Sequence, residues 1–121
     1  EADKHGTLAM LKSLKTGTAL VLLLDLAVGH GIAVNFMGRR VYCSVTAASF
    51  ALKTKALFVP YFSMRNRDGE SFSVEIGTPI EHSDAQTMTR EATKSLEERV
   101  HADPGNWFWI HRRWKYCPPT D

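Results

Sequence analysis

The sequence predicts an α/β fold in which a mixed sheet is flanked by helices. Two wholly apolar runs of strand length, residues 18–24 and 56–62, are typical of strands that are buried on both faces. Residues 72–76 alternate apolar and polar side chains, as a half-buried strand does. Residues 88–100 carry an apolar side chain at every fourth position, which indicates a helix packed on the sheet.

Composition fits one packed domain that covers residues 1–121. The chain is 44% hydrophobic and 23% charged, and its formal net charge of +2 does not favour a nucleic-acid binder. Cys43 and Cys117 are too few for a disulfide framework and indicate thiols of a reducing compartment. Both apolar runs are far shorter than the roughly 20 residues that a membrane span needs.

The first part of the chain predicts a helix followed by a buried strand. Leucines recur at three-residue spacing over residues 7–16, which predicts a short amphipathic helix that Gly17 ends. The strand 18–24 follows, and Asp25 closes it. Because only one helix precedes a strand of this central type, and the sequence starts at Glu1, we expect the chain to be the C-terminal portion of a longer protein.

The middle of the chain predicts a second, less apolar strand, a helix and a hairpin. Residues 32–36 form the strand candidate, and Gly38-Arg39-Arg40 follows as a basic turn. Small and apolar residues over 44–54 predict a helix that lies close to the sheet. Asp68-Gly69 is a tight-turn signal inside a hairpin from about residue 57 to residue 76.

The last predicted helix starts near Ser83 and Gln86, which resemble a capping box. Pro104-Gly105 ends it. Beyond that break, residues 106–115 are dense in aromatic and cationic side chains.

Histidines and cysteines offer no convincing catalytic or metal centre. Glu97 and His101 lie four residues apart on the predicted helix, and a surface ion pair is the better interpretation. No His/Cys spacing matches a zinc site, and Gly29-x-Gly31 lacks the third glycine and the helix of a phosphate loop. The sequence therefore predicts no metal site and no cofactor.

Asp25 is a candidate functional residue because it directly follows a predicted buried strand. Open α/β sheets place their binding sites at the carboxyl ends of their strands. The alternative is a loop-starting aspartate that accepts hydrogen bonds from nearby amides. Both interpretations remain open at this point.

The aromatic and basic tail allows three interpretations. Trp107, Ile110 and Trp114 can share one helical face, which leaves the cations together. Tryptophan beside arginine and lysine suits a membrane interface, and it also suits nucleic-acid binding by stacking and phosphate contacts. The third interpretation is that the tryptophans complete the core and the cations are solvated.

At this tail the sequence resembles a known family. Asn106-Trp-Phe-Trp-Ile-His-Arg-Arg-Trp-Lys115 is similar to the C-terminal signature of the bacterial lipid A biosynthesis acyltransferases, of the lauroyl and myristoyl transferase type. Four earlier segments agree in order: Leu14–Gly17 with the following strand and Asp25, Val34–Arg39, Ala51–Ala56 into Phe58–Pro60, and the hairpin around Asp68-Gly69. Lys55 departs from the pattern, since the family prefers glycine there. The resemblance covers nearly the whole chain but only the C-terminal part of a typical member.

The resemblance implies an incomplete C-terminal part of a glycerolipid-acyltransferase-like αβα layered fold. It also implies that the whole enzyme moves a fatty acyl chain from an acyl carrier protein thioester to a hydroxyl of a lipid A precursor in lipopolysaccharide biosynthesis. The family's catalytic pair is a histidine followed after four residues by an acid, and none of the five histidines here has an acid at that offset. We therefore expect no catalytic residue in this chain, a catalytic pair upstream, and no activity from the chain alone.

The resemblance also implies roles for residues of this chain outside the catalytic pair. Asp25 would support the site from the strand edge. The residues expected to contact lipid phosphates are Arg39, Arg40, His111, Arg112 and Arg113. The residues expected at the membrane interface are Trp107, Trp109, Trp114 and Lys115.

The expected location is the cytoplasmic face of the bacterial inner membrane, with the anchor outside this chain. The expected partners are acyl carrier protein, a glycolipid acceptor and the membrane surface, without nucleic acid. Two alternatives are an acyltransferase acting on another glycolipid, such as a phosphatidylinositol mannoside, and a non-catalytic module that binds anionic lipid or nucleic acid.

Overall fold

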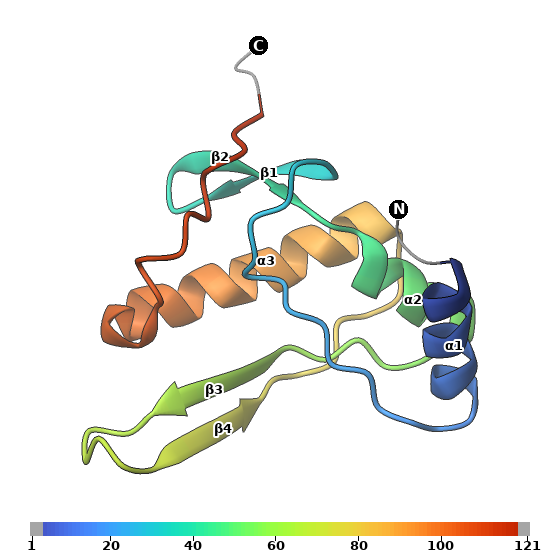
Figure 1. Ribbon diagram of the computed structural model, residues 1–121, viewed down its shortest axis with the longest axis horizontal. Coiled ribbons are helices and arrows are strands. Elements are labelled where there is room, and N and C mark those ends of the chain that lie inside the picture. The colour runs from blue at the N-terminus through green and yellow to red at the C-terminus, as the bar shows by residue number, and fades with distance from the viewer. Residues whose placement is uncertain (1–3, 119–121) are drawn as a thin grey trace.

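A computed structural model describes residues 4–118 of the chain, and Figure 1 shows its arrangement. The elements in order are α1 (Lys4–Lys15), β1 (Ile32–Phe36), β2 (Arg39–Cys43), α2 (Thr46–Thr54), β3 (Tyr61–Arg65), β4 (Phe72–Ile76), α3 (Ala85–Ala102) and the 3₁₀ turn η1 (Pro104–Asn106). The predicted α/β class is confirmed. Figure 1 shows α3 running between the two hairpins, β1–β2 on one side and β3–β4 on the other.

The strands of the described residues form two separate antiparallel pairs rather than one mixed sheet. In the first pair Ile32 lies opposite Cys43, and in the second Tyr61 lies opposite Ile76. A single antiparallel bridge between Phe58 and Ile80 extends the second hairpin. The predicted hairpin from about residue 57 to residue 76 is thus confirmed. The expected burial of its second strand is wrong, because Phe72, Val74 and Ile76 of β4 are exposed.

The predicted strand over residues 18–24 does not form. This segment is extended, but no backbone hydrogen bond joins residues 19–24 to the rest of the described chain. Most of its side chains are exposed, with Val21 exposed by 69% and Leu23 by 68%, whereas Leu20 and Leu24 are half-buried. A strand needs a neighbouring backbone to satisfy its amides and carbonyls, and residues 4–118 offer this segment none.

Strand β2 differs from the sequence-based expectation, in which Gly38-Arg39-Arg40 is a basic turn. The turn is Met37-Gly38, whose φ angles of 52° and 72° both lie in the left-handed region. Two consecutive left-handed residues make the two-residue turn that matches the twist of a hairpin. Arg39 and Arg40 therefore begin β2, and the buried side chains of this strand are Val41 and Cys43.

The capping residues of α2 and α3 differ from those that the sequence pattern favours. Helix α2 ends at Thr54, and its C-cap Lys55 is left-handed with φ 58°, a conformation that favours the glycine of the family pattern. Helix α3 is capped by Asp84 rather than by Ser83. Its Oδ1 accepts the backbone N–H groups of Gln86 at 2.9 Å and Thr87 at 3.0 Å. The side-chain hydrogen bond from Thr87 lowers the pKa of Asp84.

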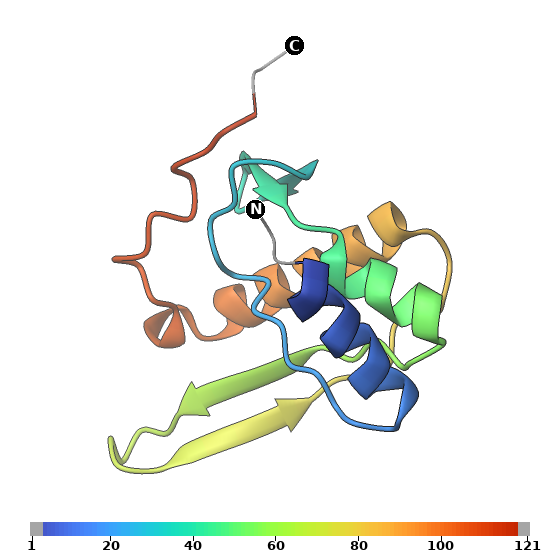
Figure 2. The ribbon, with the colours of Figure 1, turned by 45° about the vertical axis from the view of Figure 1, so that its right-hand side comes forward.

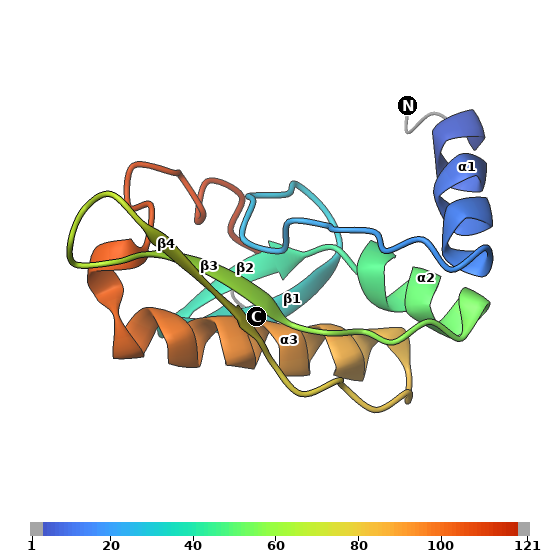
Figure 3. The ribbon, with the colours of Figure 1, turned by 90° about the horizontal axis from the view of Figure 1, so that it is seen from below.

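Helix α3 lies beside the β1–β2 hairpin and α2, as Figures 2 and 3 show from two further sides, and the core forms between these elements. One buried cluster joins Phe36, Val41, Cys43 and Val100. A second cluster joins Ala48, Ala51 and Met88 between α2 and α3. The four-residue stripe of α3 thus serves both clusters, as the periodicity predicts.

Candidate functional site

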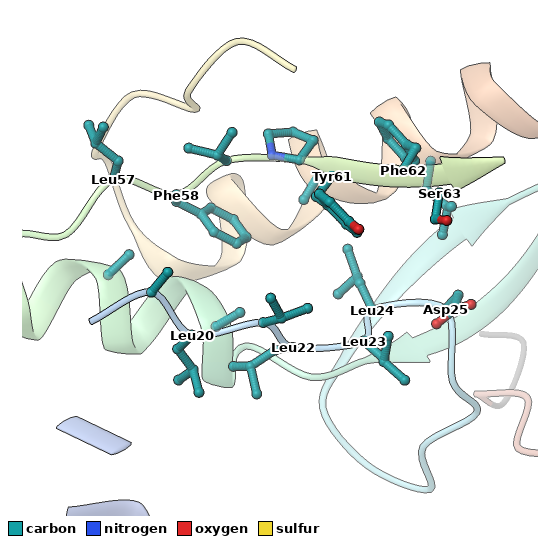
Figure 4. A pocket seen from close by; sticks show the side chains of 18 of the residues that line it. Leu20, Leu22, Leu23, Leu24, Asp25, Leu57, Phe58, Tyr61, Phe62 and Ser63 are labelled. Atoms are coloured by element: carbon teal, nitrogen blue, oxygen red, sulfur yellow. The ribbon is translucent and has the colours of Figure 1, made fainter. Parts of the chain in front are cut away.

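The structure contains an apolar groove of about 840 Å³. Figure 4 shows its two walls, with Leu20, Leu22 and Leu24 on one extended segment and residues 57–63 on the other. Helix α3 contributes Ala92, Leu96 and Arg99 to the lining. An elongated groove with apolar walls suits an extended apolar ligand or chain.

Asp25 lies at one end of this groove, on the side of Phe62 and Ser63 (Figure 4). Its side chain is partly buried, and Oδ1 is inaccessible to solvent without a hydrogen-bond partner among residues 4–118. A buried carboxylate oxygen without a donor is costly. No amide of the described residues donates a hydrogen bond to it. Asp25 therefore lacks the hydrogen bonds of an aspartate that starts a loop.

The end of the groove also carries Arg99, which sequence reasoning did not single out. Its guanidinium pairs with Glu75 of β4 and lies 5.5 Å from the centroid of the Phe62 ring. Glu75 and Arg99 lie on different elements, and the alternation of residues 72–76 predicts Glu75 on the solvent side of its strand, so no local signal points to this pair.

The aromatic and basic tail is not helical, so the predicted shared face of Trp107, Ile110 and Trp114 does not exist. Trp107 and Trp114 instead pack on Phe36, with ring centroids at 5.6 Å and 6.0 Å. This arrangement corrects their expected place at a membrane interface, because both rings complete the core. Trp109 is 53% exposed, and its indole N–H donates to the carbonyl of Pro104 at 2.8 Å.

Arg113 is the most deeply buried cation of the described chain, with 1% of its surface exposed. One guanidinium nitrogen donates to the carbonyl of Leu26 at 2.7 Å and to that of Tyr42 at 3.2 Å. The other lies 3.0 Å from the sulfur of Cys43. Arg113 therefore cannot reach a lipid headgroup in this structure, which corrects its expected role.

His111 also turns inward rather than joining an exposed cationic cluster. Its Nε2 accepts the backbone N–H of Ala27 at 2.9 Å. An accepting Nε2 leaves the ring proton of a neutral imidazole on Nδ1. His111 thus binds the chain's own backbone, two residues beyond Asp25.

Three of the arginines expected to contact phosphate lie nearer the surface. Arg39 is exposed, and its guanidinium lies 5.6 Å from the centroid of the Trp114 ring, so β2 and the tail are brought together. Arg112 is exposed and Arg40 is partly buried. Lys115 is exposed beside Tyr116, with 4.9 Å between its ammonium nitrogen and the ring centroid.

One further predicted ionic contact lies on α3. His101 and Glu97 form the expected pair on α3 at 3.7 Å, with the His101 side chain 65% exposed. Residues 4–118 contain no group of three or more His, Cys, Asp or Glu side chains arranged to hold a metal ion. None of the helices described for these residues is long and apolar enough to cross a bilayer.

Comparison with known proteins supplies the family. The bacterial lipid A biosynthesis acyltransferases match residues 2–116. A lipid A biosynthesis acyltransferase of Haemophilus influenzae is 26% identical over 123 residues, which covers 96% of this chain and 40% of the relative. The chain thus spans well under half the length of that relative, and the chain belongs to the bacterial lipid A biosynthesis acyltransferase family.

Proposed function

We propose that this chain is the C-terminal portion of an acyltransferase that moves a fatty acyl chain from an acyl carrier protein thioester to a hydroxyl of a lipid A precursor. Membership of the family supports acyl transfer in lipid A synthesis. The observation that carries the proposal within this structure is the unpartnered Asp25 oxygen at the end of an apolar groove. An apolar groove of this kind can hold an acyl chain. The carboxylate of Asp25 at its end would then lie near the reacting thioester and hydroxyl.

The proposed reaction needs a base that these residues do not supply. An alcohol is a weak nucleophile unless a base is hydrogen-bonded to it. As the acceptor oxygen bonds to the thioester carbonyl carbon, the base takes the hydroxyl proton. The carbon–sulfur bond then breaks, and the leaving thiolate receives that proton. We assign this base to a histidine in the part of the whole enzyme that lies outside this chain.

Asp25 would act on that histidine rather than on the substrate. A carboxylate can orient an imidazole and stabilise the imidazolium that forms when the proton is taken. Because Oδ1 has no donor among residues 4–118, an imidazole N–H would satisfy it. The imidazole of that histidine would be the hydrogen-bond partner that Asp25 lacks among the described residues.

The surface residues receive roles consistent with a membrane-bound acceptor. Exposed Arg39 and Arg112 would contact lipid phosphates, since guanidinium matches phosphate with two hydrogen bonds. Arg40 remains a weaker candidate for the same role. Trp109 and Lys115, together with exposed Phe108, would face the headgroups at the cytoplasmic side of the inner membrane.

An acyl-transfer assay with the longer enzyme tests this proposal. Asp25→Asn should lower kcat by about 10²- to 10⁴-fold, because the amide cannot stabilise an imidazolium. Asp68→Asn, in the exposed hairpin loop, is the control and should keep full activity. The isolated 121 residues should transfer no acyl chain, and turnover by them would contradict the proposal. Acceptor profiling of the longer enzyme separates lipid A precursors from another glycolipid such as a phosphatidylinositol mannoside.

A second candidate function, a non-catalytic module that binds anionic lipid, rests on exposed tail residues. Phe108, Trp109 and Ile110 are 66%, 53% and 83% exposed beside Arg112 and Lys115. This function predicts salt-dependent binding of the isolated chain to anionic vesicles, weakened by Arg112→Ala. Absence of binding to vesicles and oligonucleotides would exclude it.

A further inference from the structure

We propose that His111 and Arg113 are positioning residues that hold Asp25 at the end of the apolar groove. The catalytic consequence rests on the proposed function, whereas the positioning itself does not. Both side chains reach the two residues that directly follow Asp25. They do so from the tail, 84 and 87 residues away along the chain.

Two hydrogen bonds make this clamp. The N–H of Ala27 donates to Nε2 of His111 at 2.9 Å, and the guanidinium of Arg113 donates to the carbonyl of Leu26 at 2.7 Å. One bond uses a backbone donor and the other a backbone acceptor. Together they fix both the position and the orientation of the peptide that leaves Asp25.

The clamp matters because the chain on the other side of Asp25 is not held. Residues 19–24 form no backbone hydrogen bond to another part of the described chain, and most of their side chains are exposed. Among residues 4–118, the carboxylate of Asp25 has no bond through Oδ1 either. The position of Asp25 is therefore set from its C-terminal side, by the tail.

Arg113 is itself rigidly placed. Its guanidinium is 5.8 Å from the centroid of the Phe36 ring and also contacts the carbonyl of Tyr42 and the sulfur of Cys43. No carboxylate pairs with it among the described residues, although burial of a cation is costly without one. This set of acceptors fixes the geometry of the guanidinium through hydrogen bonds and packing, and so fixes Leu26 against β2.

Nuclear magnetic resonance of this chain tests the clamp without any activity. Arg113→Lys and His111→Ala should shift the amide resonances of Leu26 and Ala27 and the carboxyl ¹³C resonance of Asp25. Arg90→Lys, on the exposed side of α3, is the control and should leave these resonances in place. Circular dichroism checks that each variant is folded. Unchanged resonances of residues 25–27 in a folded His111→Ala variant would overturn the proposal.

Kinetics of the longer enzyme test the consequence. Because a misplacement of about 1 Å can cost about 10²-fold in rate, Arg113→Lys should lower kcat by at least about tenfold. The KM for the acyl donor should stay within about twofold, since no substrate contact is lost. Combined with Asp25→Asn, Arg113→Lys should cause no further loss, because both act through one carboxylate.

Multiplying losses in the double variant would overturn the positioning role, because a general loss of stability acts independently of Asp25. An inactive wild-type enzyme would instead count against the proposed function. In that case the resonance measurement still decides whether the clamp holds Asp25.

Discussion

Glu97 of α3 accepts the backbone N–H of Met37, with 3.0 Å between the nitrogen and Oε1. Met37 is a left-handed residue of the β1–β2 turn, so this bond ties the turn of the first hairpin to the long helix. The same oxygen lies 3.7 Å from Nε2 of His101. Glu97 therefore holds two elements together, although its place among charged neighbours suggests only a solvated helix face.

Glu97→Ala should lower the free energy of unfolding by about 1–2 kcal/mol, because the Met37 amide loses its acceptor in a partly buried place. Glu97→Gln retains an oxygen acceptor and should cost less. Glu98→Ala is the matched control, since Glu98 is 67% exposed and pairs only loosely with Lys94 at 3.8 Å. Urea unfolding measures all three, and equal losses for Glu97→Ala and Glu98→Ala would contradict the prediction.

Phe36→Ala should destabilise the protein by about 3–5 kcal/mol, the usual cost of removing a buried aromatic ring. Phe36 has no exposed surface and supports Trp107, Trp114 and the guanidinium of Arg113. Tryptophan fluorescence should move to longer wavelength as both indoles gain water. Phe72→Ala, at a side chain that is 66% exposed, should change neither property much.

The parts of the fold that the sequence predicts are those with local causes. Helix α3 follows from a four-residue apolar stripe, and the β3–β4 hairpin follows from Asp68-Gly69 and the alternation after it. Hydropathy alone predicts a strand at residues 18–24, and this strand does not form because pairing requires a distant backbone. Strand β2 was hidden because its two arginines resembled a turn.

The difference between local and distant causes also explains which parts of the candidate site the sequence predicts. Asp25 has a local signal in the sequence, since it is a polar residue that directly follows an apolar run. The inward course of His111 and Arg113 has no local signal, because an arginine is solvated in most proteins and its partners here lie at Leu26, Tyr42 and Cys43. Only the three-dimensional path of the tail shows that these side chains act on the chain beside Asp25.

Acid should weaken the capping of α3 through Asp84. The hydrogen bond from the Thr87 side chain lowers the pKa of Asp84 below its value in an unfolded chain, about 3.9. The ionised cap therefore stabilises the fold fully above that value, and this contribution is lost as the pH falls through the lower pKa of the folded state. Asp84→Asn does not titrate, so its stability difference from wild type should shrink between pH 7 and pH 2 in urea unfolding. A difference independent of pH would contradict this assignment.

Lys55→Gly should stabilise the protein by about 0.5–1 kcal/mol. Lys55 holds a left-handed conformation at the end of α2, which costs a non-glycine residue about 1–2 kcal/mol, and the flexibility of glycine in the unfolded chain offsets part of that gain. Lys53→Gly, inside the last turn of α2, should destabilise by about 1 kcal/mol instead. Thermal unfolding of the two variants should therefore move in opposite directions, and a lower midpoint for Lys55→Gly would refute the prediction.

Gly31→Ala should be among the most damaging single changes in the β1–β2 region. Gly31 has φ 133°, where an alanine is strained, and a Cβ at this position would overlap the carbonyl oxygen of Cys43. The strained conformation alone costs about 1–2 kcal/mol, and relief of the overlap requires the backbone of Cys43 to move. Cys43 contacts Arg113, so the change should also disturb the clamp on Leu26. Gly29→Ala is the control two residues away, since its Cβ would meet only the ring of Tyr116 at 3.9 Å. Urea unfolding with the Leu26 amide resonance as a second readout should separate the two variants, and similar behaviour of both would show that Gly31 is not conformationally required.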